Sequence, residues 1–194
     1  RECAENFDFM TFYNQLHHFC NVDLSAFYFD IRKDSLYCDG KNTTVRKAAR
    51  TVMNIAFNHL VHWLAPVLSF TAEEAWRMRH EDENISIHLS EFPEAPKIWH
   101  NHDLNAQWKI IRDVRRVVTG ALEIKRADKT LGSSLQGAVK IYVSSEIAEA
   151  LKGFDMAELS ITSAAEVLTD AAPADAFTMQ EIQDVAAVIE VATG

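Results

Sequence analysis

The spacing of apolar side chains predicts a helix over residues 6–20. Its apolar positions recur every three or four residues and therefore share one helix face. They are Phe9, Phe12, Tyr13, Leu16 and Phe19. Asn6 or Asp8 can cap the start, because a short polar side chain accepts hydrogen bonds from the first unpaired backbone N–H groups. Asn21 interrupts the pattern, so we expect this helix to end before it.

A second helix is predicted from Asp23 to about Lys33 or Leu36, within the stretch Val22–Cys38. An aromatic block of three residues, at 27–29, precedes a charged run at 30–34. Physical arguments alone favour core packing followed by a solvated helix end. Aromatic side chains beside basic ones also suit a helix that is anchored on one side and touches nucleic acid on the other.

The third predicted helix covers residues 44–64 and carries an apolar stripe. The stripe consists of Val45, Ala49, Val52, Ala56, Leu60 and Trp63. Arg46, Lys47 and Arg50 lie on the opposite face of its first half. In its second half the apolar surface widens through Met53, Phe57, Val61 and Leu64. We therefore expect that end to be the buried centre of a bundle.

Shorter elements follow between residues 66 and 101. Pro66 ends or kinks the third helix, because proline lacks a backbone N–H. Thr71 and Glu74 have capping-box spacing, which predicts a helix from Ala72 to about His80. Alternating apolar and polar residues at 85–92 predict an extended segment, and the two prolines that follow predict a connection.

A long helix is predicted over residues 103–127, with Asp103 as its cap. Its broad apolar arc consists of Leu104, Trp108, Ile111, Val114, Val117, Val118, Ala121 and Leu122. Lys109, Arg112 and Arg116 stack on the opposite side.

After Gly132 the periodicity changes to mixed content. Residues 138–143 read as a strand and 146–151 as a short helix, with further strand candidates at 166–168 and 186–191. The sequence thus predicts a mainly α fold. A bundle of about five helices occupies residues 1–128, and a small acidic α+β region occupies residues 129–194.

Composition is typical of a soluble globular protein, with 194 residues, 48% hydrophobic and 24% charged. Three cysteines without C-x-x-C spacing suggest reduced thiols in the cytoplasm. No apolar run reaches the length of a membrane-spanning helix, so we expect no membrane partner. Because the chain begins with Arg1, we expect a piece of a longer protein.

The formal net charge of −9 is unevenly distributed. Residues 146–194 contain ten acidic residues and one basic residue, Lys152, and residues 1–145 contain 18 of each. An RNA surface would therefore lie in the first three quarters of the chain. The segment 109–129 has a local charge of +4 from seven basic and three acidic residues. These groups would position RNA through its phosphates, although a solvated helix face is an equally good interpretation.

Candidate catalytic chemistry is sparse. The sequence has no G-x-S-x-G, Walker or G-x-G-x-x-G motif, so we expect no catalytic residue. His59 and His62 lie one helical turn apart, yet cysteines or carboxylates at matching spacing are missing, so we expect no metal site. The Gly132 loop follows a helix instead of preceding one, which favours a helix C-cap over a phosphate loop.

Four ordered segments resemble the isoleucyl-tRNA synthetase family of class Ia ligases, in its anticodon-binding domain. These segments are Val22–Tyr37, Leu64–Trp76, Ser86–Pro93 and Arg126–Leu135. The resemblance implies a fragment that binds the anticodon arm of tRNA. It also implies that aminoacylation with ATP belongs to a catalytic domain of the same chain, and that the parent protein uses zinc. We expect no cofactor in this fragment, a monomer and a cytoplasmic location.

The candidate tRNA contacts are the basic residues of the predicted helices. They are Arg46, Lys47, Arg50, Lys109, Arg112 and Arg116, with Arg32 and Lys33 as weaker candidates. Phe27 and Tyr28 fit the core better than a base-stacking role. One alternative is a scaffold module that packs on the rest of a class Ia synthetase. Another is the same domain of a valine- or leucine-type enzyme.

Overall fold

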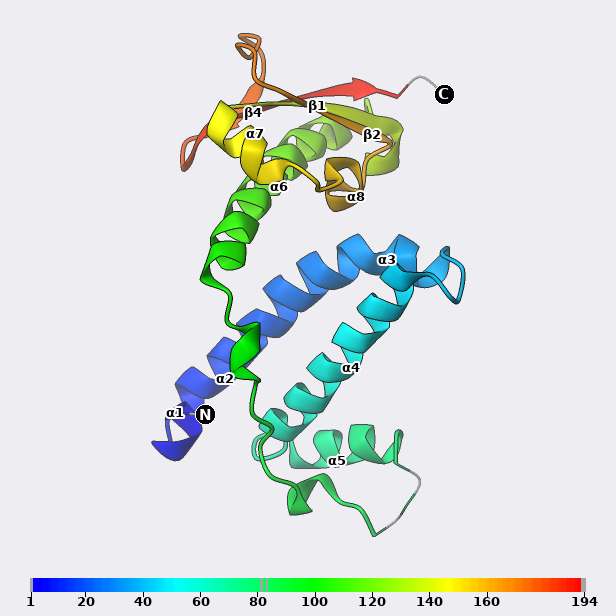
Figure 1. The fold of residues 1–194 in the computed structure, drawn as a ribbon, viewed down its shortest axis with the longest axis vertical. Coiled ribbons are helices and arrows are strands. Elements are labelled where there is room, and N and C mark those ends of the chain that lie inside the picture. The colour runs from blue at the N-terminus through cyan, green and yellow to red at the C-terminus, as the bar shows by residue number, and fades with distance from the viewer. Residues whose placement is uncertain (1, 81, 83, 193–194) are drawn as a thin grey trace. The chain divides into compact units, whose positions relative to one another are not determined.

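The computed structural model describes residues 2–80, 82 and 84–192. The chain forms two compact units, Arg1–Lys97 and Ile98–Gly194. The first unit is helical, and the second combines helices with a sheet (Figure 1). The predicted class, a mainly α protein with a helical bundle before a small α+β region, is confirmed. Compactness divides the chain at residue 97, whereas the predicted boundary at 128/129 marks the end of a helix that packs within the second unit.

The first unit begins with a helical run that has a π-helical centre. Its elements are α1 (Glu2–Glu5), α2 (Phe9–His18), the π-helix η1 (Phe19–Phe29) and α3 (Asp30–Tyr37). Asp8 caps α2 and accepts a hydrogen bond from the Thr11 backbone N–H at 3.1 Å. The predicted break at Asn21 is wrong. The Asn21 side chain is hydrogen-bonded to His17 Nε2 at 3.0 Å, so it does not compete for the backbone there, and the helix continues in wider turns.

Four apolar side chains of this run are buried, namely Phe12, Leu16, Leu24 and Ile31, together with the small polar Ser35. Phe27 and Tyr28 are half-buried, which agrees with a packing role. Phe29 is 37% exposed, so the aromatic block is only partly in the core.

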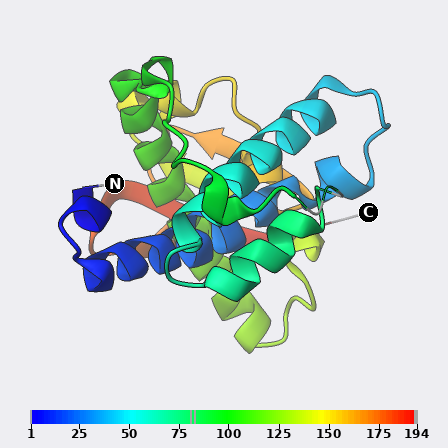
Figure 2. The same cartoon turned by 90° about the horizontal axis from the view of Figure 1, so that it is seen from below.

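Helix α4 (Thr44–Leu64) has the predicted bounds and packs beside α3 at its beginning. Helix α5 (Ser69–Arg77) then lies across the other end of α4 (Figures 1 and 2). The predicted capping box is wrong, since α5 starts before Thr71 and Leu68 occupies its N-cap position. Burial of Ala72 and Trp76 against Val61 and Ala65 instead places this helix by packing.

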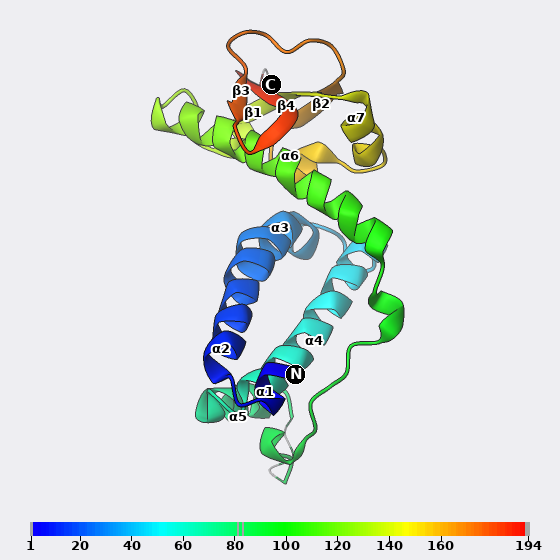
Figure 3. The ribbon, with the colours of Figure 1, turned by 90° about the vertical axis from the view of Figure 1, so that its left-hand side faces the viewer.

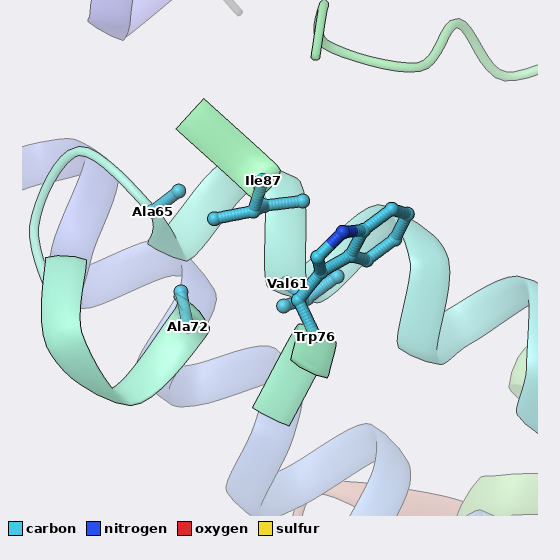
Figure 4. Close-up of a cluster of buried hydrophobic side chains, with 5 residues drawn as sticks. All are labelled: Val61, Ala65, Ala72, Trp76 and Ile87. Carbon is cyan, nitrogen blue, oxygen red and sulfur yellow. The ribbon is translucent and has the colours of Figure 1, made fainter. Parts of the chain in front are cut away.

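A small core joins α4, α5 and the segment after α5 (Figure 4). It consists of Val61, Ala65, Ala72, Trp76 and Ile87. The predicted extended segment at 85–92 is wrong at its centre, which forms the 3-10 turn η2 (Ile87–Leu89). Burial explains the turn, because Ile87 is only 2% exposed and must face this core.

Glu73 holds the turn η2 against α5. Its Oε2 accepts hydrogen bonds from Ser86 Oγ at 2.9 Å and from the Ile87 backbone N–H at 3.0 Å. Its Oε1 accepts one from Arg77 Nε at 2.7 Å. The hydrogen bond from Arg77, the largest cause, and those from the turn hold the pKa of Glu73 below its ordinary value. Glu73, rather than the predicted Glu74, is thus the carboxylate that organises this region.

The second unit is a sheet with a long helix on one face (Figure 3). After the 3-10 turn η3 (Lys97–Trp99), its helices are α6 (His102–Ala127), α7 (Ser145–Leu151) and α8 (Met156–Ser160). A 3-10 turn, η4 (Ser134–Gln136), leads into the strands β1 (Gly137–Val143), β2 (Ala164–Leu168), β3 (Phe177–Met179) and β4 (Ile182–Val191). The strand order is β2-β1-β4-β3, with β1 and β2 parallel and the other pairs antiparallel. Helix α8 and strand β3 are too short for the sequence pattern to have predicted them.

The predicted apolar arc of α6 provides its contact with the sheet. Six of its side chains are buried, namely Ile111, Val114, Val117, Val118, Ala121 and Leu122. The predicted cap at Asp103 is wrong, because Asn101 accepts the hydrogen bond from the Leu104 backbone N–H at 3.0 Å. Helix and sheet therefore share one core, which explains why α6 belongs to the second compact unit.

Candidate nucleic-acid interface

A polar stripe on α4 forms one wall of an open hollow of about 820 Å³ in the first unit. Lys47, Arg50 and Asn54 follow one another at intervals of three and four residues, so they lie along one side of the helix. The hollow is lined by Lys47, Arg50, Thr51, Met53, Asn54, Phe57 and Arg79. We call it the α4 hollow. It combines cations with an aromatic ring, an amide and a hydroxyl group.

Arg79 reaches the α4 hollow from the chain just after α5. Its Nη2 donates a hydrogen bond to Asn54 Oδ1 at 2.6 Å. Its guanidinium carbon lies over the Phe57 ring, 4.8 Å from the ring centroid. A planar guanidinium stacks well on an aromatic face. Arg79 is therefore held by two side chains of α4 and adds a third cation to the hollow.

The structure divides the predicted α4 cluster. Lys47 and Arg50 are exposed and line the α4 hollow together. Arg46 is half-buried, and its Nη1 donates a hydrogen bond to the Asp39 carbonyl oxygen at 2.6 Å. Arg46 thus ties the turn before α4 to the first turn of the helix.

The prediction that the second half of α4 is a buried centre is only partly right. Val61 is buried, at 5% exposure, but Met53 is 36% exposed and Phe57 is half-buried. Met53 and Phe57 line the hollow instead. The apolar surface of this half is divided between the small core and the wall of the hollow.

The second predicted cluster belongs to α6, in the other compact unit. Lys109 is exposed and Arg112 is half-buried. Arg116 lies 3.6 Å from Asp113 Oδ1 and 4.0 Å from Glu181 Oε2, so acidic neighbours reduce its local field. Arg115 Nε donates a hydrogen bond to the Leu159 carbonyl oxygen at 2.7 Å, which anchors α8 to α6. Acidic neighbours and a structural contact thus occupy part of this cluster.

The two weaker candidates on α3 are also engaged within the fold. Lys33 Nζ donates to Asp30 Oδ1 at 2.9 Å, and this hydrogen bond raises the pKa of Lys33. Burial raises the pKa of Tyr28, and the charge of the half-buried Arg32 nearby opposes this rise in part. Both cations therefore act at least partly within α3 and its neighbours.

The residues of the hollow that sequence reasoning missed are Asn54, Thr51 and, above all, Arg79. Arg79 is 25 residues from Asn54 in the chain. No periodicity links the two residues, because their contact depends on how α5 crosses the end of α4. The available signal was the pair of basic residues Arg77 and Arg79 at the end of a predicted helix, and that signal favours a helix-dipole role.

Among the residues that the structure describes, no group of three or more His, Cys, Asp or Glu side chains could hold a metal ion. Cys3, Cys20 and Cys38 are free thiols, and burial raises the pKa of Cys20. Of the helices in this part of the chain, none combines the length and the apolar character needed to cross a bilayer.

Comparison with known proteins identifies the family of this fold. A family model described as the anticodon-binding domain of tRNA ligase matches residues 1–143. The chain belongs to this family. The matched residues include α4, α5 and the whole α4 hollow, together with α6.

Similar curated proteins are longer than this anticodon-binding chain. The isoleucine–tRNA ligase of Agrobacterium fabrum is 48% identical over 195 residues, which cover 100% of this chain and 20% of that protein. The isoleucine–tRNA ligase of Ruegeria pomeroyi is 50% identical over 195 residues, with the same coverage. That of Bartonella henselae is 48% identical over 182 residues, which cover 93% of this chain and 19% of that protein. The chain thus spans about a fifth of the length of these relatives.

Proposed function

We propose that this chain binds the anticodon arm of isoleucine tRNA as the anticodon-binding part of an isoleucine–tRNA ligase. The observation that carries the proposal is the α4 hollow, where Lys47, Arg50 and Arg79 converge beside an aromatic ring. Three cations at one concave surface suit a phosphate backbone, which dominates the affinity of most nucleic-acid complexes. The family match and the isoleucine–tRNA ligase relatives support the choice of RNA.

The other basic candidates form part of the same proposal. Lys47 and Arg50 are the first phosphate contacts, with Lys109 and Arg112 as contacts from the second unit. Arg46, Arg116, Arg32 and Lys33 contribute to the positive field while they keep the contacts described above. No catalytic residue is assigned to this chain.

The remainder of the proposal concerns the longer protein. Aminoacylation of isoleucine tRNA with ATP takes place on a catalytic domain of the same chain, and zinc binds elsewhere in that protein. The parent enzyme is a cytoplasmic monomer. Within the chain, residues 1–128 carry the basic helices and form the anticodon-binding part, and the acidic residues 129–194 contact RNA less.

A scaffold role is the second candidate, and exposed apolar side chains favour it. Phe7 is 79% exposed, Met10 72%, Phe70 93% and Met78 83%. All four belong to the first unit, which therefore offers apolar surface to a neighbouring domain. In this case the hollow would be an ordinary solvated surface, and the chain would serve to pack on the rest of a synthetase.

Salt dependence distinguishes the two candidates. A labelled anticodon stem-loop of isoleucine tRNA is titrated with the 194-residue chain at about 50 and about 200 mM salt. The four phosphate contacts named above predict that affinity falls roughly 50- to 150-fold between these conditions. The double variant Lys47→Glu and Arg50→Glu should lose most of the binding. The slope of log affinity against log salt concentration should become shallower by about two, because each phosphate contact contributes about one.

The matched control is Lys152→Glu, which reverses an exposed charge on the acidic side of the chain. It should leave the affinity nearly unchanged. Weak binding whose affinity does not change with salt concentration or with charge reversal would support the scaffold role instead. Preference for a valine or leucine stem-loop would move the chain to that enzyme type.

A further inference from the structure

The side chains around Arg79 form more than a cluster of charge. Its guanidinium carbon lies over the Phe57 ring, 4.8 Å from the ring centroid, and the hydrogen bond from Nη2 to Asn54 Oδ1 restricts the rotation of the guanidinium. Arg79 is nevertheless an exposed residue that lines the hollow. A flat cationic surface, already oriented by two partners, therefore faces the space between α4 and the end of α5.

The hollow is larger and less polar than a phosphate requires. A phosphate group binds through N–H donors. Arg79 has fewer of these to offer, because its Nη2 already donates to Asn54 Oδ1. Met53 and Phe57 contribute apolar wall, which offers nothing to a phosphate. A nucleobase, in contrast, has apolar faces that stack on arginine planes and aromatic rings.

We propose that the α4 hollow seats one unstacked base of a single-stranded RNA loop, stacked on the outer face of Arg79. Lys47 and Arg50 contact the phosphates on either side of that nucleotide. This proposal rests on the proposed function, and it assigns Arg79, Phe57 and Asn54 a role that phosphate binding alone would not give them.

Asn54 adds recognition of the base edge. Its Oδ1 is used by Arg79, so the amide nitrogen keeps both of its N–H donors for the hollow. Thr51 Oγ1 donates to the Lys47 carbonyl oxygen at 2.9 Å, which leaves this hydroxyl as an acceptor. The α4 hollow thus offers N–H donors from Asn54 and a hydroxyl acceptor from Thr51, which lies one helical turn away. We call this arrangement the base seat. These groups match a base edge that carries an acceptor and an amino or imino group.

The decisive variant is Arg79→Lys, which keeps the charge and removes the plane. Anticodon stem-loops are prepared with an abasic residue at each loop position in turn. For the unaltered chain, loss of the seated base should weaken binding about 5-fold or more, since stacking of one base is worth about 1–3 kcal/mol. Arg79→Lys should cause a similar loss with the intact loop, with an unchanged salt slope. Combining this variant with that abasic loop should cost little more.

Two controls separate this role from a structural one. Arg77→Lys makes the same exchange two residues earlier, at a side chain that binds Glu73, and should bind the intact loop normally. Asn54→Ala keeps all cations and should lose both affinity and preference among bases at the seated position. Circular dichroism of each variant checks that the helices are intact.

The possible results are distinct. If Arg79→Lys and Asn54→Ala both bind the intact loop as the unaltered chain does, with the steep salt dependence retained, the base seat is refuted and the proposed function stands. If every abasic position weakens the Arg79→Lys complex as much as the unaltered one, the base seat is again refuted. If the unaltered chain binds no stem-loop at low salt, the proposed function fails and the seat with it.

Discussion

Replacement of Ile87 by alanine tests whether packing of the turn η2 holds α5 in place. Ile87 is 2% exposed and contacts the core formed with Val61 and Trp76. The change removes three carbon atoms, worth about 2.4 kcal/mol at about 0.8 kcal/mol per buried methylene. A residual cavity adds to this, and measured isoleucine-to-alanine changes in cores cost about 2–5 kcal/mol. We expect the free energy of unfolding of the first unit to fall by about 3 kcal/mol.

The assay must report on this unit alone, because the chain has two compact units. Hydrogen exchange of the α5 backbone amides, followed by mass spectrometry of peptides over residues 69–77, gives a local opening free energy. Leu89→Ala is the control, since Leu89 lies in the same turn but is 81% exposed. It should change that free energy by less than about 0.5 kcal/mol.

The same variant has a functional consequence. Arg79 follows α5 directly, and its contact with Phe57 requires α5 to lie across α4. Ile87→Ala should therefore weaken stem-loop binding, whereas Leu89→Ala should not. A loss of stability below about 1 kcal/mol, or equal effects of the two variants, would refute the view that this small core positions α5.

Two further predictions concern single residues that the fold constrains. The hydrogen bond from Arg77 and those from the turn η2 lower the pKa of Glu73, so its stabilising effect is complete above its ordinary value of 4.5 and is lost as pH falls through the lowered value. Acid titration of α5 exchange should show this loss, and Glu73→Gln should remove that part of the pH dependence. Gly120→Ala would place a methyl carbon 2.7 Å from Met179 Cε and 2.8 Å from Phe177 Cε1. Overpacking of about 1–3 kcal/mol then outweighs a gain in helix propensity of about 1 kcal/mol, so urea unfolding should show a net loss; a net gain would mean that both side chains move aside freely.

The long helices could be predicted because their periodicity extends over many turns. Helix α4 has 21 residues and α6 has 26, so single deviations could not hide the apolar faces. The ends of these helices were harder to predict, because several neighbouring residues can cap a helix. Asp103 has the right side chain, but Asn101 has the right backbone position. The type of side chain determines which residues are able to cap a helix, and the backbone conformation before the helix determines which of them does so.

The site was only half predictable. Lys47 and Arg50 could be found because helical spacing alone puts them on one face. Arg79 could not be found, because its position depends on Trp76 and Ile87 packing at the far end of α4. Asn21 illustrates the same limit, since its low helix propensity is real but its hydrogen bond to His17 removes the competition with the backbone. Local rules failed where a partner distant in the sequence, or one helical turn away, took up the polar group.

The π-helical segment η1 lies between His18 and Asp30, and its number of residues sets the direction in which α3 continues from α2. Each residue of an α-helix advances the chain by about 100° around the axis. Deletion of one residue from η1 would therefore change the angular phase of α3 relative to α2, even if every remaining side chain stayed the same. The turn after α3 would leave in another direction, and α4 would carry Lys47 and Arg50 with it. Homologous domains that differ in length here should therefore present their α4 surfaces in different directions relative to α2.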